Sequence, residues 1–93
     1  MAPTQPDLRI VRRDDLQEFH LLDADDVVST LGFEQRGTTV VLLHTATPED
    51  LRHRGYASTL VEGALDELAR DGSHVLVRCP FVRWWQGTAR SRG

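Results

Sequence analysis

The segment Arg52-His53-Arg54-Gly55-Tyr56-Ala57 decides how this chain is expected to fold, because an apolar run ends before it and a helical pattern begins after it. A glycine in such a loop lets backbone approach a ligand closely. The first amides of the following helix lack partners within the helix, and the helix dipole gives them partial positive charge. The segment therefore predicts a site for a phosphate or pyrophosphate, although glycine after a polar loop is also an ordinary helix start.

The residues on either side of this loop strengthen the prediction. The stretch 38–47, Thr-Thr-Val-Val-Leu-Leu-His-Thr-Ala-Thr, has an unbroken apolar middle that suits a strand buried on both faces, and Pro48-Glu49-Asp50 ends it. From Ala57 to Gly72 apolar residues recur at helical spacing, namely Leu60, Val61, Ala64, Leu65 and Leu68. This is the pattern of a helix that lies on a sheet.

Strands are also expected before the apolar run. Residues 18–22 and 27–34 read as two strands joined by an acidic turn at 23–26, and a second turn at 35–37 leads into the apolar strand. Residues 7–15 mix apolar and charged side chains and predict at most an edge strand. The first half of the chain therefore predicts an antiparallel meander.

The residues after the helix predict one more strand. The stretch 74–78 is too short for a helix, and Cys79-Pro80 closes it because the residue before a proline avoids helical dihedrals. A strand, a crossover helix and a strand in this order favour a right-handed unit, so 74–78 is expected to be parallel to the strand at 40–47. Residues 81–86 are expected to form a short helix or an edge segment.

Size and composition predict one domain over residues 1–93, with flexible ends at 1–6 and 88–93. The chain is 40% hydrophobic and 27% charged, and its net charge of −3 argues against a nucleic-acid partner bound through charge alone. The single cysteine, Cys79, excludes an internal disulfide framework. Without a signal-peptide core or an apolar run of about 20 residues, the sequence predicts a cytoplasmic protein with no membrane partner.

Five motifs in this sequence have the order and spacing typical of one family. They are His44-Thr45, Pro48-Glu49, the Arg52-x-Arg54-Gly55-Tyr56-Ala57 loop, the apolar helix residues within 60–65, and Cys79-Pro80-Phe81-Val82. The combination resembles the small single-domain branch of the GCN5-related N-acetyltransferases. The resemblance covers residues 19–85, and the pairing of His-Thr with Cys-Pro-Phe-Val is more specific to that branch than the glycine loop.

The resemblance implies an α/β (α+β) fold with a mixed, mostly antiparallel sheet and one main helix crossing between two splayed parallel strands. Acetyl-coenzyme A would enter the splay between residues 40–47 and 75–79, and its pantetheine arm would pair with the strand edge near Ala46 and Thr47. Its pyrophosphate would bind the backbone of the loop and the first helical turn: Arg52, His53, Arg54, Gly55, Tyr56, Ala57, Ser58 and Thr59. Side-chain contact from Arg52 or Arg54 is also expected.

The activity implied by the resemblance is acetyl transfer to a primary amine of a small molecule or peptide. Such a reaction needs a base for the amine proton and a donor for the developing oxyanion. His44, with Thr45 beside it, is the candidate base if it faces the splay, and a histidine that merely caps the sheet is the alternative. Cys79 is a candidate nucleophile or acid, and a small buried core residue is the alternative.

Two positions depart from the pattern of the family. Typical members carry glutamate after His-Thr, where this chain has Ala46, and glycine is frequent where this chain has His53. The missing carboxylate supports an alternative function, a coenzyme A-binding or protein-interaction module with weak or no turnover. No metal site is expected, because only His44 and Cys79 could converge and zinc needs roughly three or four protein ligands.

The remaining expectations concern the paired tryptophans and the oligomeric state. Trp84 and Trp85 are adjacent and cannot both face one side of a regular element, so one is expected in the core and the other exposed or lining the cleft. The chain is expected to be a monomer or a homodimer.

Overall fold

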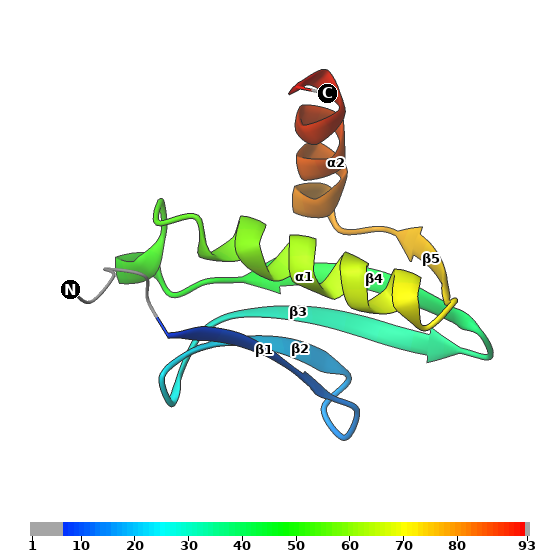
Figure 1. Cartoon of the computed structure of the whole chain (residues 1–93), viewed down its shortest axis with the longest axis horizontal. Coiled ribbons are helices and arrows are strands. Elements are labelled where there is room, and N and C mark those ends of the chain that lie inside the picture. The colour runs from blue at the N-terminus through cyan, green and yellow to red at the C-terminus, as the bar shows by residue number, and fades with distance from the viewer. Residues whose placement is uncertain (1–6, 93) are drawn as a thin grey trace.

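The computed structural model describes residues 7–92, with the side chains of residues 7–88. Its sheet has five strands in the order β1-β2-β3-β4-β5 (Figure 1). The strands are β1 (Leu8–Arg13), β2 (Glu18–Asp23), β3 (Asp26–Arg36), β4 (Thr39–Ala46) and β5 (His74–Val77). A 3₁₀ turn, η1 (Glu49–Leu51), precedes the helix α1 (Tyr56–Arg70), and the helix α2 (Pro80–Arg92) ends the described chain. Neither helix in this part of the chain is long and apolar enough to cross a membrane.

The arrangement confirms the predicted mixed sheet. Strands β1 to β4 form an antiparallel meander, and β5 pairs with β4 in parallel after the α1 crossover. The segment at 7–15, predicted as an edge strand at most, is the edge strand β1. The predicted flexible end at 1–6 lies outside the described residues.

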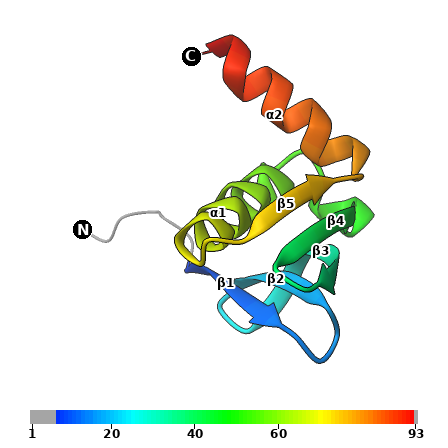
Figure 2. The same ribbon diagram turned by 90° about the vertical axis from the view of Figure 1, so that its right-hand side faces the viewer.

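Helix α1 covers one face of the sheet, as the end-on view in Figure 2 shows. Four residues of its predicted apolar stripe are fully buried, and Leu65 is half-buried against the same core. They pack on alternate residues of the central strands, which therefore share one face. The buried set comprises Leu60, Val61, Ala64 and Leu68 of α1 with Phe19, Leu21, Leu31, Phe33, Val40 and Leu42 of the sheet.

The pairing of β4 with β5 ends at Leu42, which is opposite Val77. The carbonyl oxygen of Leu42 accepts two hydrogen bonds, from the amides of Arg78 at 2.9 Å and Cys79 at 3.1 Å. On its other side β4 continues to pair with β3 as far as Ala46. Within the described residues, the β4 edge beyond Leu42 therefore has no strand beside it, and this opening is the expected splay.

A β-bulge accompanies this opening. Gly32 is opposite His44 and Phe33 is opposite Leu42, so Leu43 is an extra residue on β4. A bulge bends its strand and shifts the alternation of side chains by one residue. The bulge therefore decides which face of the sheet each residue at the end of β4 occupies.

Helix α2 differs from the short element that the sequence predicted at 81–86. It begins at Pro80, where a proline is well tolerated, and projects away from the sheet (Figure 1). In the end predicted to be flexible, 88–93, residues 88–92 have helical backbone, and residue 93 lies outside the described residues. The reason is local, since alanine and arginine favour helix and no proline follows Pro80.

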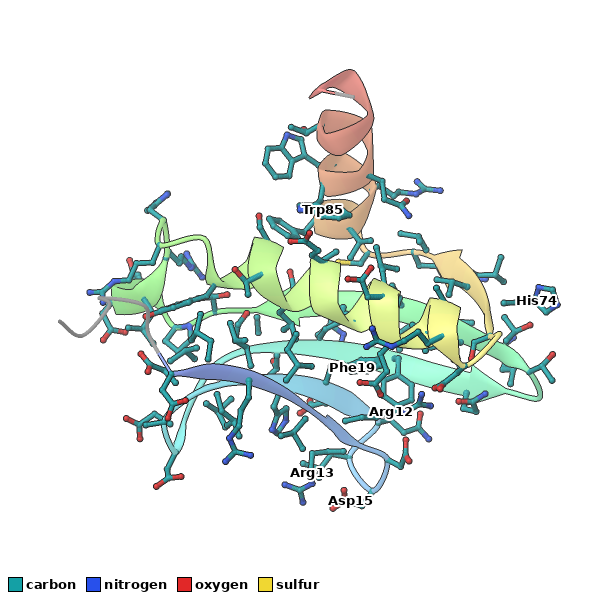
Figure 3. The ribbon with its side chains drawn as sticks, in the orientation of Figure 1. Arg12, Arg13, Asp15, Phe19, His74 and Trp85 are labelled. Carbon is teal, nitrogen blue, oxygen red and sulfur yellow. The ribbon has the colours of Figure 1, made fainter. Side chains whose placement is uncertain are left out.

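Arg12 closes the core at the end of β1. Its guanidinium lies over the ring of Phe19 (Figure 3), 5.5 Å from its centroid, and 4.9 Å from the ring centroid of Phe33. The same group donates hydrogen bonds to Asp14 at 2.7 Å and Gln35 at 2.8 Å. With its side chain only 19% exposed, Arg12 joins β1 to β3 over the edge of the core.

We expect Arg12→Ala to lower the free energy of unfolding by about 1–2 kcal/mol, since a partly desolvated cation–π contact and its hydrogen bonds are lost together. Urea denaturation followed by circular dichroism measures the change. Arg9→Ala is the matched control, because Arg9 lies on the same strand with its side chain 58% exposed and 3.9 Å from Asp25. Equal effects of the two substitutions would contradict this role of Arg12.

Candidate functional site

A cavity of ≈ 550 Å³ opens where β4, the loop before α1 and the start of α2 meet. We call it the splay cavity. Its volume lies within the range of about 300–1,000 Å³ usual for ligand pockets. Its walls are Thr45, Ala46, Thr47, Leu51, Arg52, His53, Gly55, Tyr56, Ala57, Ser58, Phe81 and Trp84.

The loop wall leaves the start of α1 uncapped. Gly55 is the N-cap residue with φ of 80°, a left-handed conformation that glycine adopts without strain. No side chain caps the helix, and its first turn holds no acidic residue. The first backbone hydrogen bond of the helix is donated by the amide of Thr59 to the carbonyl oxygen of Gly55, at 3.0 Å. The amides of Tyr56, Ala57 and Ser58 thus have no intrahelical acceptor and are available to an anion.

His53 occupies an uncommon backbone conformation in the same loop. Its φ is 69°, in the left-handed region that favours glycine. This explains in physical terms why a glycine suits that position better. The two left-handed residues, His53 and Gly55, fold the loop tightly between η1 and α1.

The loop is tied to the end of β4 through polar contacts. Arg52 Nε donates to the carbonyl oxygen of Thr47 at 3.3 Å. The buried hydroxyl of Ser29 lies 2.8 Å from Thr47 Oγ1 and donates to the carbonyl oxygen of Ala46 at 3.3 Å. The side chain of Arg52 therefore links the loop to the end of β4. Arg54 is exposed and forms no ion pair with the described residues.

The uncovered edge of β4 forms the opposite wall. Thr45 pairs with the core residue Leu31 and so faces the α1 side of the sheet, where it lines the splay cavity with Ala46 and Thr47. Backbone groups of an unpaired edge can hydrogen-bond an extended ligand as an added strand would. The cavity thus combines a helix start whose first amides have no intrahelical acceptor with an uncovered strand edge.

His44 lies outside the splay cavity. It pairs with Gly32 and faces the side of the sheet opposite to α1, where it is exposed. Its imidazole lies over Gly32, since a Cβ added to Gly32 would come within 2.6 Å of His44 Cε1. The structure therefore does not bring His44 and Cys79 together in one cavity.

Cys79 is part of the core. Its side chain is 1% exposed and packs in the hydrophobic cluster beneath α1. It does not line the splay cavity, and the same is true of Arg54 and Thr59 among the predicted cofactor residues. The geometry favours the alternative in which Cys79 is a small buried residue.

Aromatic residues of α2 complete the cavity. Phe81 and Trp84 line it, with ring centroids 5.5 Å apart and planes inclined by 43°. Trp84 is 58% exposed, whereas Trp85 packs against the core near the base of α2 (Figure 3). The sequence left open which tryptophan is buried, and Leu51 and Phe81 were not predicted to line the cavity. The spacing of three residues between Phe81 and Trp84 was the available signal, because it places both on one face of a helix.

Comparison with known proteins decides the family. Residues 18–90 match the family described as GCN5-related N-acetyl-transferase. The chain belongs to this family. A comparison with curated proteins gives no significant match. Members of this family are acetyltransferases that generally use acetyl-coenzyme A.

We expect Cys79 in the native acetyltransferase-family domain to react with iodoacetamide or Ellman's reagent at least about a hundredfold more slowly than in urea, because a buried thiol must wait for opening of the core. Mass spectrometry of timed samples measures the rate. The urea-unfolded chain supplies the control. Labelling at the unfolded rate under native conditions would contradict the burial of Cys79.

Proposed function

We propose that this domain binds acetyl-coenzyme A in the splay cavity and transfers the acetyl group to a primary amine. One observation carries the proposal: the uncapped amides of α1 and the unpaired edge of β4 line the same cavity. An anion and an extended amide chain are bound by these two features respectively. Coenzyme A carries both, as a pyrophosphate joined to pantetheine.

The pyrophosphate would be held by the turn between Arg52 and Ser58. The amides of Tyr56, Ala57 and Ser58 supply hydrogen-bond donors, and the left-handed Gly55 leaves no Cβ in the way. Arg54 is the cation best able to add charge, since Arg52 is already bonded to Thr47. No acidic side chain in the first turn of α1 opposes the anion.

The pantetheine arm would lie against β4 between Leu42 and Thr47. Its amides would pair with the backbone edge that β5 leaves uncovered. Leu51, Phe81 and Trp84 supply apolar walls for its methylene and geminal methyl groups. The donor set and the apolar surface therefore both fit this cofactor.

Acetyl-coenzyme A, when bound, supplies an acetyl thioester whose C–S bond breaks as the amide bond forms. His44 does not face the splay cavity, so its proposed role as base requires an amine that approaches from the opposite face and loses its proton at the open edge of β4. Thr45, the next residue, lies on the opposite face of the strand and lines the splay cavity, where it would contact the bound cofactor. Cys79 supports packing beneath α1 and has no exposed sulfur with which to attack.

A second candidate function is a coenzyme A-binding module without turnover. The residues that line the splay cavity include no carboxylate, and Ala46 lies where family members typically place one. A module would bind the cofactor through the same amides and edge. The two candidates differ only in whether an acceptor reacts.

We expect coenzyme A to bind with a Kd in the micromolar range, and Gly55→Val to weaken binding at least tenfold, since a branched residue is strained at this φ. Isothermal titration with coenzyme A and with adenosine measures the affinities. Gly37→Val is the matched control, because Gly37 also has a positive φ, 61°, and open space but lies in the β3–β4 turn. Absence of binding at millimolar coenzyme A would remove both candidate functions.

We expect free-thiol release from acetyl-coenzyme A with a panel of primary amines, and His44→Gln to lower kcat by roughly 10²-fold or more. The affinity for coenzyme A should stay unchanged, because His44 does not line the splay cavity. His74→Gln is the control, since His74 is exposed at the start of β5, far from the base of α2 (Figure 3). Cofactor binding without thiol release from any amine would favour the module.

A further inference from the structure

A second hollow lies on the face of the sheet that α1 does not cover. We call it the far-face hollow, and its volume is ≈ 420 Å³. It is lined by Asp15, Leu16, Gln17, Glu18, Gly32, Phe33, Leu43 and His44. These residues come from the β1–β2 turn and from three neighbouring strands, so the fold itself assembles this surface.

Gly32 forms the floor of the far-face hollow. In the register of the sheet Glu18 is opposite Gly32, and Gly32 is opposite His44. The three residues form one row on one face, with Glu18 and His44 roughly 10 Å apart at Cα, which is two strand spacings. Because Gly32 has no side chain, the imidazole of His44 can lie over its backbone, on the side of β4 that faces Glu18.

The walls of the far-face hollow combine charge with apolar surface. Glu18 Oε1 lies 2.7 Å from His20 Nε2, and the Glu18 side chain is 32% exposed. The hydrogen bond that Arg13 donates to Asp15 lowers the pKa of the Asp15 carboxyl, and the Arg13 charge offsets it. Arg13 lies opposite Glu18 in the register of β1 and β2 but is bonded to Asp15, so among the described residues Glu18 has no arginine ion pair. Leu16, with its side chain half exposed, lies in the turn beside it.

The far-face hollow and the splay cavity meet at β4. Leu43 and His44 line the hollow, and the next three residues, Thr45 to Thr47, line the cavity. Both sites lie along the same stretch of strand edge that β5 leaves uncovered. A molecule in the hollow is therefore on the opposite face from a ligand in the cavity and next to the same edge.

We infer that the far-face hollow is the acceptor site of the proposed acetyltransferase and that it takes an alkyl amine carrying a second cationic group. Glu18 holds the second cation, the apolar surface of Leu16 and Leu43 contacts the methylene chain, and His44 faces the reacting nitrogen. The acetyl transfer to this amine rests on the proposed function, whereas binding of the amine in the far-face hollow does not depend on it. A free alkyl diamine and a lysine in a basic peptide share this chemistry.

In the proposed transfer step, the amine nitrogen replaces sulfur on the acetyl carbon. The lone pair of the amine nitrogen forms the new N–C bond, while the C–S bond breaks and leaves its electron pair on sulfur. The proton lost by the nitrogen goes to the imidazole of His44. Glu18 takes no part in bond making and is a positioning residue for the second cation.

Amide NMR of the ¹⁵N-labelled full chain tests binding without requiring turnover. With 1,5-diaminopentane at millimolar concentration, we expect the largest shifts at Gln17, Gly32, Leu43 and His44, and at least threefold weaker binding of pentylamine. A dilysine peptide blocked at both ends tests the peptide source. Shifts confined to the Arg52–Ala57 loop, or equal affinities for diamine and monoamine, would overturn the inference. A separate titration with coenzyme A tests the splay cavity, so the two failures are distinguishable.

Substitution of the carboxylate tests the role of Glu18. We expect Glu18→Gln to weaken diamine binding three- to tenfold, to raise the KM for 1,5-diaminopentane by a similar factor, and to leave kcat and coenzyme A affinity unchanged. The KM for pentylamine should stay the same, since it has no second cation. Glu62→Gln is the matched control, because Glu62 is exposed on α1 and the substitution removes the same charge at a distant position. Identical behaviour of the two variants would overturn the inference.

The floor of the hollow offers a steric test. Gly32→Ala places a methyl group within 2.6 Å of His44 Cε1, so the imidazole must move. We expect this variant to lose at least tenfold in diamine affinity and to keep its coenzyme A affinity, which also reports that the sheet is folded. Unchanged diamine affinity in a folded Gly32→Ala protein would count against the hollow.

Discussion

The point at which β5 leaves β4 governs the rest of this structure. The carbonyl oxygen of Leu42 accepts the amides of both Arg78 and Cys79, so the ladder closes there with one acceptor serving two donors. The next residue, Pro80, has no amide to continue the ladder and begins α2 instead. Every later feature of the splay cavity follows, because the freed edge of β4, the turn before α1 and the base of α2 surround the gap.

The small size of the chain explains why the two faces of its sheet differ. A single crossover helix covers one face, and the buried side chains of β2, β3 and β4 gather beneath it. Antiparallel strands tolerate a solvated face, so the opposite side can carry polar residues such as Glu18 and His20 without loss of the core. Arg12 marks the boundary, since it stacks on core aromatic rings while bonding to polar partners at the rim.

Sequence reasoning succeeded where a periodic pattern is continuous and long. The apolar run at 38–47 and the helical stripe from Leu60 to Leu68 fixed β4, α1 and their order. It could not assign the facing of His44, because simple alternation from the core residue Leu42 would put His44 toward α1, whereas the bulge at Leu43 turns it to the other face. For Cys79 the sequence left two alternatives, and the burial of its side chain in the core beneath α1 favours the small buried residue over a nucleophile.

The same bulge has a functional consequence for the proposed reaction. Without the extra residue, His44 and Thr45 would exchange faces, and the imidazole would lie among the groups that line the splay cavity. With it, the strand edge separates the far-face hollow, the proposed acceptor site, from the splay cavity, the proposed cofactor site, and the two are one residue step apart. A domain of this size has little interior in which to build an acceptor pocket. Using both faces of a single strand edge gives it two adjoining surfaces without a second layer of helices.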